Sequence, residues 1–170
     1  MEVTNEALRT ERVLEERARI LARVPKVSTR AADEIEVAVC TVGSESFGFP
    51  VHLLREIVPL PVVTTLPFAP ECLLGIAQVR GTLLSVFDMA KVSQVKGTSN
   101  ATHLVVVEAP EGAIGFTVDQ VLSCRNVSPS ALQGNGALRG ERRAALGITT
   151  DLVVVVDVPA LLALPELILE

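Results

Sequence analysis

A dense succession of short apolar runs, each closed by glycine or proline, most constrains how this chain can fold. The runs have the length of β-strands and are rich in valine, which favours extended backbone over helix. From residue 34 onward no long helical pattern alternates with them, so they indicate barrels rather than a parallel sheet flanked by helices. The chain is therefore predicted to be mainly β. The predicted strands are Ile35–Val42, Phe47–Val51, Leu54–Val58, Leu73–Val79, Leu83–Phe87, His103–Glu108, Ala113–Val118, Val121–Val127 and Ile148–Val158.

The predicted core is aliphatic. Hydrophobic residues make up 49% of the 170 residues, yet there is no Trp or Tyr and there are only five Phe. A domain of this size can withdraw roughly 68–70% of its unfolded surface from water, so Val, Leu, Ile and Ala must fill its interior. The formal net charge of −5 and the scarcity of aromatic rings both argue against nucleic-acid binding.

Residues 6–23 differ from the rest of the chain. Charged residues four apart and a narrow apolar stripe at helical spacing predict a helix, which Pro25 is expected to end. We predict an N-terminal helix and linker over 1–33 and a main domain over 34–170. The helix would either pack on its own barrel or dock with a partner.

Two other segments are expected to be helical. Glu71–Leu74 follows a proline-bracketed turn, and the apolar tail Ala160–Leu169 would form a helix that Pro165 limits in length. The longest apolar runs are far too short to cross a bilayer, and the first residues show no signal-peptide pattern. We therefore expect a cytoplasmic protein that does not insert into the membrane.

One segment holds a charged residue between two predicted strands. It reads Gly75-Ile-Ala-Gln-Val-Arg80-Gly81-Thr-Leu-Leu-Ser-Val-Phe-Asp88. An arginine beside a flexible glycine, held by a strand on each side, has little freedom to wander, which suits recognition of a partner. The alternative is an ordinary hairpin whose arginine is solvated. The spacing alone leaves both interpretations open.

Several landmarks extend this pattern in a fixed order. They are Leu-Leu-Arg-Glu56-Ile-Val, Thr64-Thr-Leu-Pro67-Phe-Ala-Pro70, Gly75, Arg80-Gly81, Asp88, Gly115-Phe-Thr-Val-Asp119, and a valine run that ends at Asp157. Any one of them alone is weak. Their succession over roughly residues 35–164 resembles the CheW-like family, the adaptor proteins of bacterial chemosensory arrays.

The resemblance implies two small five-stranded SH3-like β-barrels that pack together along a hydrophobic seam. It implies no catalytic activity and no cofactor. The implied partners are the cytoplasmic tip of a methyl-accepting receptor and the regulatory domain of a CheA-type histidine kinase. The residues matching the family's receptor groove are Leu54, Glu56 and Arg80, and kinase contact would involve the first barrel, including the turn at Gly75. Such an adaptor is cytoplasmic and is recruited to membrane-associated receptor arrays.

The chain departs from the family pattern around the arginine. The usual Asn-Leu-Arg-Gly reads Gln78-Val79-Arg80-Gly81, and Ser85 stands where the family has a proline, so this strand gains a backbone donor. A specialised adaptor that binds the receptor but not the kinase therefore stays open. A barrel that binds a small ligand is the alternative from another class, weakened by the scarcity of aromatic residues. An enzyme is the third interpretation.

The remaining polar residues predict structural roles. Asp119 and Asp157 each end a valine-rich strand and are expected to cap turns. His52 and His103 lack metal-ligand spacing, so no metal site is expected. The cysteines, which never form a Cys-x-x-Cys pair, are expected to be small apolar side chains in a reducing compartment: Cys40, Cys72 and Cys124.

The loop Gly134–Gly147 is rich in glycine and arginine. It lacks the Gly-Lys-Ser/Thr ending of a phosphate-binding loop. We expect a basic surface loop, and its possible contacts with an acidic partner surface are Arg139, Arg142 and Arg143.

Overall fold

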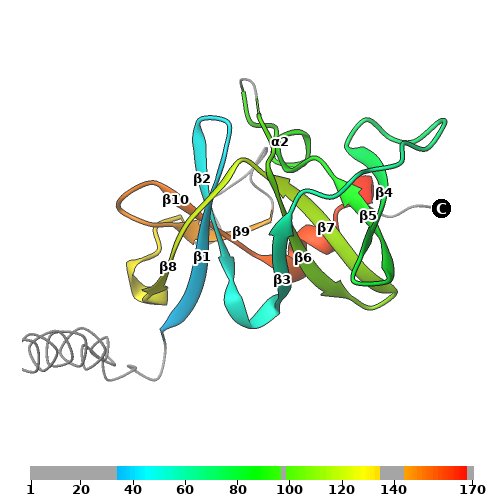
Figure 1. Ribbon diagram of the computed structural model, residues 1–170. Helices are drawn as coiled ribbons and strands as arrows, with labels where there is room; N and C mark the ends of the chain where they lie inside the picture. The colour runs from blue at the N-terminus through cyan, green and yellow to red at the C-terminus, as the bar shows by residue number, and fades with distance from the viewer. Residues whose placement is uncertain (1–33, 97–98, 135–143, 168–170) are drawn as a thin grey trace, which may run out of the picture. The chain divides into compact units, whose positions relative to one another are not determined.

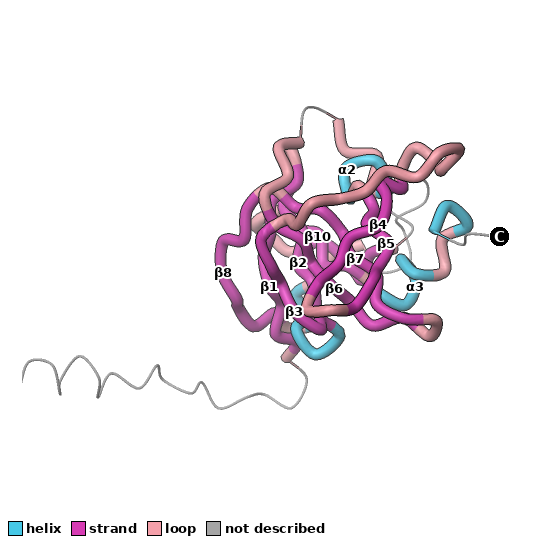
Figure 2. The backbone as a smooth tube through the Cα atoms, turned by 45° about the vertical axis from the view of Figure 1, so that its right-hand side comes forward, coloured by secondary structure: helices cyan, strands magenta, loops and turns pink. Residues whose placement is uncertain are grey.

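The computed structural model describes residues 34–96, 99–134 and 144–167. These residues form two five-stranded mixed sheets, each mainly antiparallel with one parallel pair (Figure 1), and few helices (Figure 2). The strands are β1 (Ile35–Val42), β2 (Glu45–Pro50), β3 (Leu54–Pro59), β4 (Leu73–Val79), β5 (Thr82–Phe87), β6 (His103–Ala109), β7 (Gly112–Val118), β8 (Gln120–Val127), β9 (Ala145–Ile148) and β10 (Val153–Val156). The helices are η1 (Val51–Leu53), α2 (Met89–Val92), η2 (Pro129–Ala131), α3 (Val158–Leu162) and η3 (Pro165–Leu167).

The two sheets repeat one topology. The first barrel has the order β3-β6-β7-β5-β4, and the second barrel has the order β8-β1-β2-β10-β9. In each, the parallel pair joins the third and fourth strands, β7 with β5 and β2 with β10. The first barrel uses a continuous stretch of chain, whereas the second takes β1 and β2 from before that stretch and the rest from after it.

Each sheet closes on itself through a pair of backbone hydrogen bonds. Thr64, beyond β3, exchanges bonds of 2.8 and 2.9 Å with Ile76 of β4, and Gln133, beyond β8, does the same with Ile148 of β9. These bridges join the two edge strands of each sheet, which leaves less unpaired edge than an open sheet has. The two five-stranded barrels predicted from the family resemblance are confirmed.

Three apolar clusters explain why several strands are almost continuously hydrophobic. Alternate residues of β6 show the principle, because Leu104 and Val106 fill the first barrel while Val105 and Val107 face the seam between the barrels. Val37, Val39 and their neighbours fill the second barrel. A strand buried on both faces has no polar side to alternate with. The seam also gathers Phe47, Phe49, Phe87, Phe116, Met89 and Leu161.

Both short helices begin at an aspartate that follows a central strand. The Asp88 carboxylate accepts from the Ala90 N–H at 3.0 Å to cap α2, and Asp157 accepts from the Ala160 N–H at 3.1 Å to cap α3. These side chains satisfy backbone donors that have no partner within the helix. Asp88 follows β5 and Asp157 follows β10, which are the fourth strands of their sheets. The two aspartates therefore occupy equivalent positions in the two barrels.

Three sequence-based predictions of secondary structure are wrong. Ile148–Val158 is not one strand: β9 ends at Ile148, a turn follows, and β10 begins at Val153. Glu71–Leu74 is not helical, because Leu73 already pairs with Phe87 in the sheet. The C-terminal helix begins earlier than predicted, with Pro159 in its first turn, where proline's missing N–H costs no hydrogen bond. The N-terminal helix predicted over 6–23 lies outside the described residues.

Candidate functional site

The candidate site is built on the tight turn between β4 and β5. Val79 pairs with Thr82, which leaves Arg80 and Gly81 as the two-residue loop. Both have left-handed backbone, with φ of 48° and 85°. This is the combination that a type I′ hairpin turn requires, and such a turn follows the natural twist of its strands. The turn fixes the direction in which the Arg80 side chain leaves the backbone.

Arg80 is bonded to Glu56, which lies on β3 at the opposite edge of the same sheet. The Arg80 Nε donates to Glu56 Oε2 at 2.7 Å. The Glu56 side chain is 17% exposed and the Arg80 side chain is 78% exposed. The ion pair therefore adds a second link between the edge strands of the first barrel, and it leaves most of the guanidinium in solvent.

Leu54, the third residue of the predicted receptor groove, packs against the cluster in the seam between the barrels. It is half-buried and lies at the start of β3. A register shift between Leu54 and Glu56 separates the two residues along the strand. The structure thus brings Glu56 and Arg80 together, while Leu54 belongs mainly to the packing between the barrels.

Gly75 is a buried residue of β4 rather than part of an exposed turn. Its φ is +143°, and a Cβ there would lie 2.0 Å from the Thr64 carbonyl oxygen. No side chain fits, because the backbone of the β3–β4 connection crosses directly over this position. Gly75 therefore permits the Thr64–Ile76 bridge and seats that connection on the first barrel.

The connection seated by Gly75 exposes apolar side chains. Val62 is 90% exposed, and Phe68, which has a φ of 62°, is fully exposed. Leu83, on the neighbouring strand β5, is 69% exposed. These three exposed apolar side chains all belong to the first barrel and its β3–β4 connection. No sequence signal marks them as exposed, since Phe68 lies in the proline-bracketed turn and Leu83 in a predicted strand.

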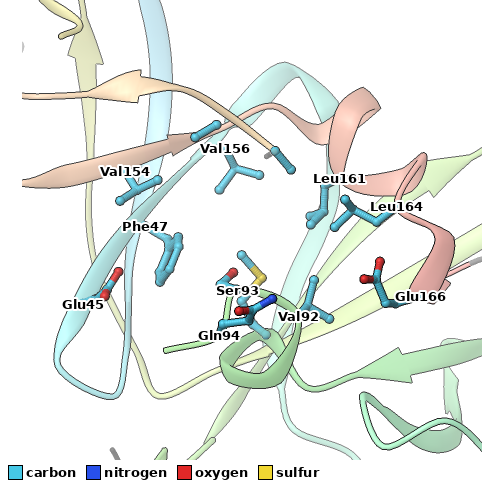
Figure 3. A pocket seen from close by; sticks show the side chains of 13 residues that line it. Glu45, Phe47, Val92, Ser93, Gln94, Val154, Val156, Leu161, Leu164 and Glu166 are labelled. Atoms are coloured by element: carbon cyan, nitrogen blue, oxygen red, sulfur yellow. The ribbon is translucent and has the colours of Figure 1, made fainter. Parts of the chain in front are cut away.

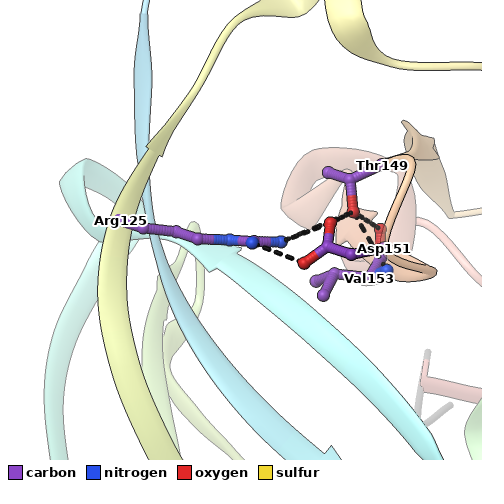
Figure 4. Close-up of polar contacts among 4 residues, drawn as sticks. All are labelled: Arg125, Thr149, Asp151 and Val153. Atoms are coloured by element: carbon purple, nitrogen blue, oxygen red, sulfur yellow. Dashed lines mark hydrogen bonds and ion pairs between the residues drawn. The ribbon is translucent and has the colours of Figure 1, made fainter.

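The second barrel carries a comparable ion pair that the sequence did not reveal. Arg125 of β8 donates from both terminal amino groups to Asp151 in the β9–β10 turn, at 2.5 and 3.0 Å (Figure 4). The Thr149 hydroxyl donates to the same carboxylate at 2.7 Å and accepts from the Val153 N–H. These bonds hold the pKa of Asp151 well below its ordinary value, Arg125 contributing most. No local spacing could pair Arg125 on β8 with Asp151 in a turn 26 residues later.

A cavity of about 250 Å³ lies on the seam beside α2 and α3 (Figure 3). Its wall is mostly aliphatic, and the carboxylates of Glu45 and Glu166 lie on opposite sides of it. Among the described residues no cluster of histidine, cysteine, aspartate or glutamate could hold a metal ion. The other lining residues are Phe47, Met89, Val92, Ser93, Gln94, Ala144, Ala145, Val154, Val156, Leu161 and Leu164.

The structural roles predicted for the aspartates are confirmed. Asp119 accepts from the Gly43 N–H and from the Ser99 hydroxyl, both at 2.7 Å, so it ties two turns together. Asp157 caps α3 as described above. The three cysteines are free, with Cys40 buried and Cys124 exposed.

The Arg139, Arg142 and Arg143 contacts suggested by sequence lie outside the described residues. No helix in the part of the chain that the structure describes is long and apolar enough to span a membrane.

Comparison with known proteins identifies the family. The family model described as "CheW-like domain" matches residues 36–166, which cover both barrels. The chain belongs to the CheW-like domain family. This membership confirms the resemblance on which the prediction of two barrels rested. It supports a chemotaxis adaptor and does not favour a ligand-binding barrel.

Individual CheW proteins are similar to this chain at low sequence identity. The chain is 25% identical over 166 residues to the chemotaxis protein CheW of Klebsiella aerogenes, covering 88% of this chain and 93% of the relative. It is 22% identical over 138 residues to a probable chemotaxis protein CheW of Rhizobium etli, covering 77% and 89%. The crystal structure of the scaffolding protein TtCheW from Thermoanaerobacter tengcongensis superposes with a TM-score of 0.67 at 21% identity, covering 78% of this chain and 94% of that one.

Proposed function

We propose that this CheW-like protein is a non-catalytic adaptor that couples methyl-accepting receptors to a CheA-type histidine kinase. The observation that carries the proposal is the Glu56–Arg80 pair, which presents an exposed guanidinium from a rigid turn on a CheW-like barrel. Coupling needs no chemistry: it needs two binding surfaces whose occupancies influence each other's free energy.

The receptor surface would centre on Arg80. An exposed ion pair contributes only about 0–1 kcal/mol to stability, so stability alone is a weak reason to hold an arginine here. A side chain anchored at one nitrogen loses little further entropy when a partner binds it. Glu56 would orient Arg80, and Leu54 would fix the position of β3 from the seam side.

The kinase surface would lie on the connection that Gly75 seats. Gly75 is buried, so it would act by holding this connection in place. Val62, Phe68 and Leu83 would supply apolar contact area. Aromatic anchors dominate the binding energy of many protein interfaces, which makes Phe68 the leading candidate.

Calorimetry with both partners tests the proposal. The receptor-tip fragment and the kinase regulatory domain from the same genome would each be titrated into the purified full chain, alongside its Arg80→Ala variant. We expect wild type to bind both partners and Arg80→Ala to lose affinity for the receptor fragment only. Binding to the receptor fragment alone would identify a specialised adaptor, and binding to neither partner would refute the proposed coupling.

A further inference from the structure

The cavity beside α2 and α3 combines apolar surface with negative charge. Its wall includes Val154, Val156 and Leu161, while the carboxylates of Glu45 and Glu166 lie on opposite sides of it (Figure 3). None of the described residues that line it is a lysine or an arginine. The cavity lies in the seam rather than inside a barrel, and it shares no residue with the proposed receptor and kinase surfaces.

The end of α2 places a strained polar residue at this cavity. The Val95 N–H donates to the Ala90 carbonyl at 2.8 Å, and the Gln94 N–H donates to the Lys91 carbonyl at 3.2 Å. These two bonds form a Schellman motif, in which the residue after the helix cap has left-handed backbone and is usually glycine. Gln94 stands there with a φ of 52°. Backbone strain of this kind is concentrated at functional sites, and here it puts an amide on the cavity wall (Figure 3).

The polar side chains around the cavity can accept hydrogen bonds from a ligand. Among the described residues, the side chains of Ser93, Gln94 and Glu166 make no hydrogen bond or ion pair. A carboxylate has lone pairs for about four hydrogen bonds, so Glu45 can accept from a ligand and keep another partner. The cavity therefore offers carboxylate, amide and hydroxyl oxygens at the edge of an aliphatic surface.

We propose that this cavity binds a short aliphatic diamine, with one ammonium group at Glu166 and the other at Glu45. The methylene chain would lie against the valine and leucine side chains, and the Ser93 and Gln94 oxygens would accept further ammonium hydrogens. An anionic ligand would be repelled by both carboxylates, and an uncharged apolar one would leave them without a counter-charge. This site adds to the proposed adaptor function and does not depend on it.

The size of the cavity limits the length of the ligand. Its volume of about 250 Å³ corresponds to roughly eight water molecules, and cadaverine, the five-carbon diamine, has about seven non-hydrogen atoms. The ligand would contact both halves of the molecule, because Ser93 and Gln94 follow β5 of the first barrel whereas Glu45 begins β2 of the second. A ligand that binds only the folded protein stabilises it. Cadaverine at about 100 times its Kd is expected to raise the melting temperature by about 5–10 °C.

Calorimetric titration of cadaverine into the purified full chain tests the proposal. Pentylamine, which has one ammonium group, and pentanol, which has none, serve as matched ligands. We expect cadaverine to bind about 10-fold or more tightly than pentylamine, because only the diamine reaches both carboxylates. Equal affinity for the diamine and the monoamine would overturn the two-ended site. Absence of cadaverine binding, in calorimetry and in thermal unfolding, would overturn the proposal altogether.

An amide substitution locates the site. Glu166→Gln removes a charge and keeps the shape of the side chain, and the exposed, unpaired Glu166 carboxylate is not needed for folding. We expect this variant to bind cadaverine about 10-fold or more weakly than wild type. The matched control is Glu111→Gln, which removes an exposed charge from the β6–β7 turn and should leave the affinity unchanged. If both variants lost affinity equally, the overall charge rather than the cavity would attract the diamine, and the proposal would be wrong.

Discussion

Glu56 and Arg80 are separated by 24 residues in the sequence, yet Arg80 Nε lies 2.7 Å from Glu56 Oε2 and links the two edge strands of the first barrel. The Thr64–Ile76 backbone bridge makes the same link nearby. Since the backbone bridge already closes the barrel, that closure does not depend on the ion pair alone. The same closed frame holds the Arg80 side chain at a defined place on the surface.

Arg80→Asn should leave stability unchanged or raise it. The variant loses an exposed ion pair worth about 0–1 kcal/mol, but it gains a residue that suits the left-handed backbone, an effect of similar size. Arg80→Ala loses the pair without that gain, so it should be the less stable of the two. Thermal unfolding of the three proteins checks the order. A melting temperature that falls well below wild type in Arg80→Asn would show that the ion pair is chiefly structural.

Gly75→Ala should destabilise the protein by about 2 kcal/mol or more, because the new Cβ would collide with the Thr64 backbone as well as strain a positive φ. Gly112→Ala is the matched control. It has a similar φ of +131°, but a Cβ there would meet nothing within 4 Å. Urea unfolding of both variants separates the effect of the collision from that of the positive φ. Equal losses of unfolding free energy in the two variants would contradict the close backbone approach at Gly75. Of the two variants, only Gly75→Ala should have a lower affinity for the kinase regulatory domain.

Phe68→Ser should weaken kinase binding while leaving thermal stability nearly unchanged, since Phe68 is fully exposed. Leu152→Ser provides a control on the second barrel. Leu152 is also exposed, at 77%, and has a similar φ of 63°. Calorimetric titration of the kinase regulatory domain should show a loss of about 10-fold or more for Phe68→Ser only. Equal affinities for the two variants would remove Phe68 from the kinase surface.

The Arg125–Asp151 pair should contribute stability that depends on pH. Its bonds hold the pKa of Asp151 in the folded protein below the unfolded value of about 4. The stabilisation is therefore complete above that value and is lost as the pH falls toward the lower folded pKa. Asp151→Asn should be less stable than wild type at pH 7, with the difference shrinking below about pH 4. Denaturant unfolding of both proteins between pH 7 and about pH 3 measures this difference in stability. A difference that stays constant with pH would contradict the lowered pKa of Asp151.

The three cysteines should react with a thiol reagent in a fixed order. Burial raises the pKa of the Cys40 thiol to about 12, with a smaller contribution from Cys124. Cys72 is partly buried, and burial raises its pKa as well, whereas Cys124 is exposed. At pH 8 we expect alkylation first at Cys124, then at Cys72, and at Cys40 only in denaturant. Peptide mass spectrometry follows the order, and early modification of Cys40 would contradict its burial.

The positions of most strands were predictable because their signals are local. Apolar runs bounded by glycine, proline or turn residues give the strands from β1 to β8 to within a residue or two. The prediction from Ile148 failed because Thr149 and Thr150 are residue types that are also common in strands, whereas Thr149 and Asp151 here belong to a turn and bond to each other and to Arg125. A polar network that spans separate strands has no local pattern.

The repeated barrel could not be found as a sequence repeat. The first barrel follows the chain in order, but the second is completed by the β1–β2 hairpin from before it. Equivalent strands are therefore not separated by a constant number of residues. The equivalence becomes visible only when the strand order and the two parallel pairs are known.

The sequence by itself determined that this chain forms an aliphatic, mainly β protein of CheW-like pattern, with Arg80 and Gly81 between two strands. Those features depend on residue type and local spacing. Tertiary structure alone decided that Arg80 meets Glu56 through Nε, that Gly75 is buried under a crossing backbone, and that Phe68 is exposed. These relationships depend on barrel closure, which brings together strands that local interactions along the chain cannot join.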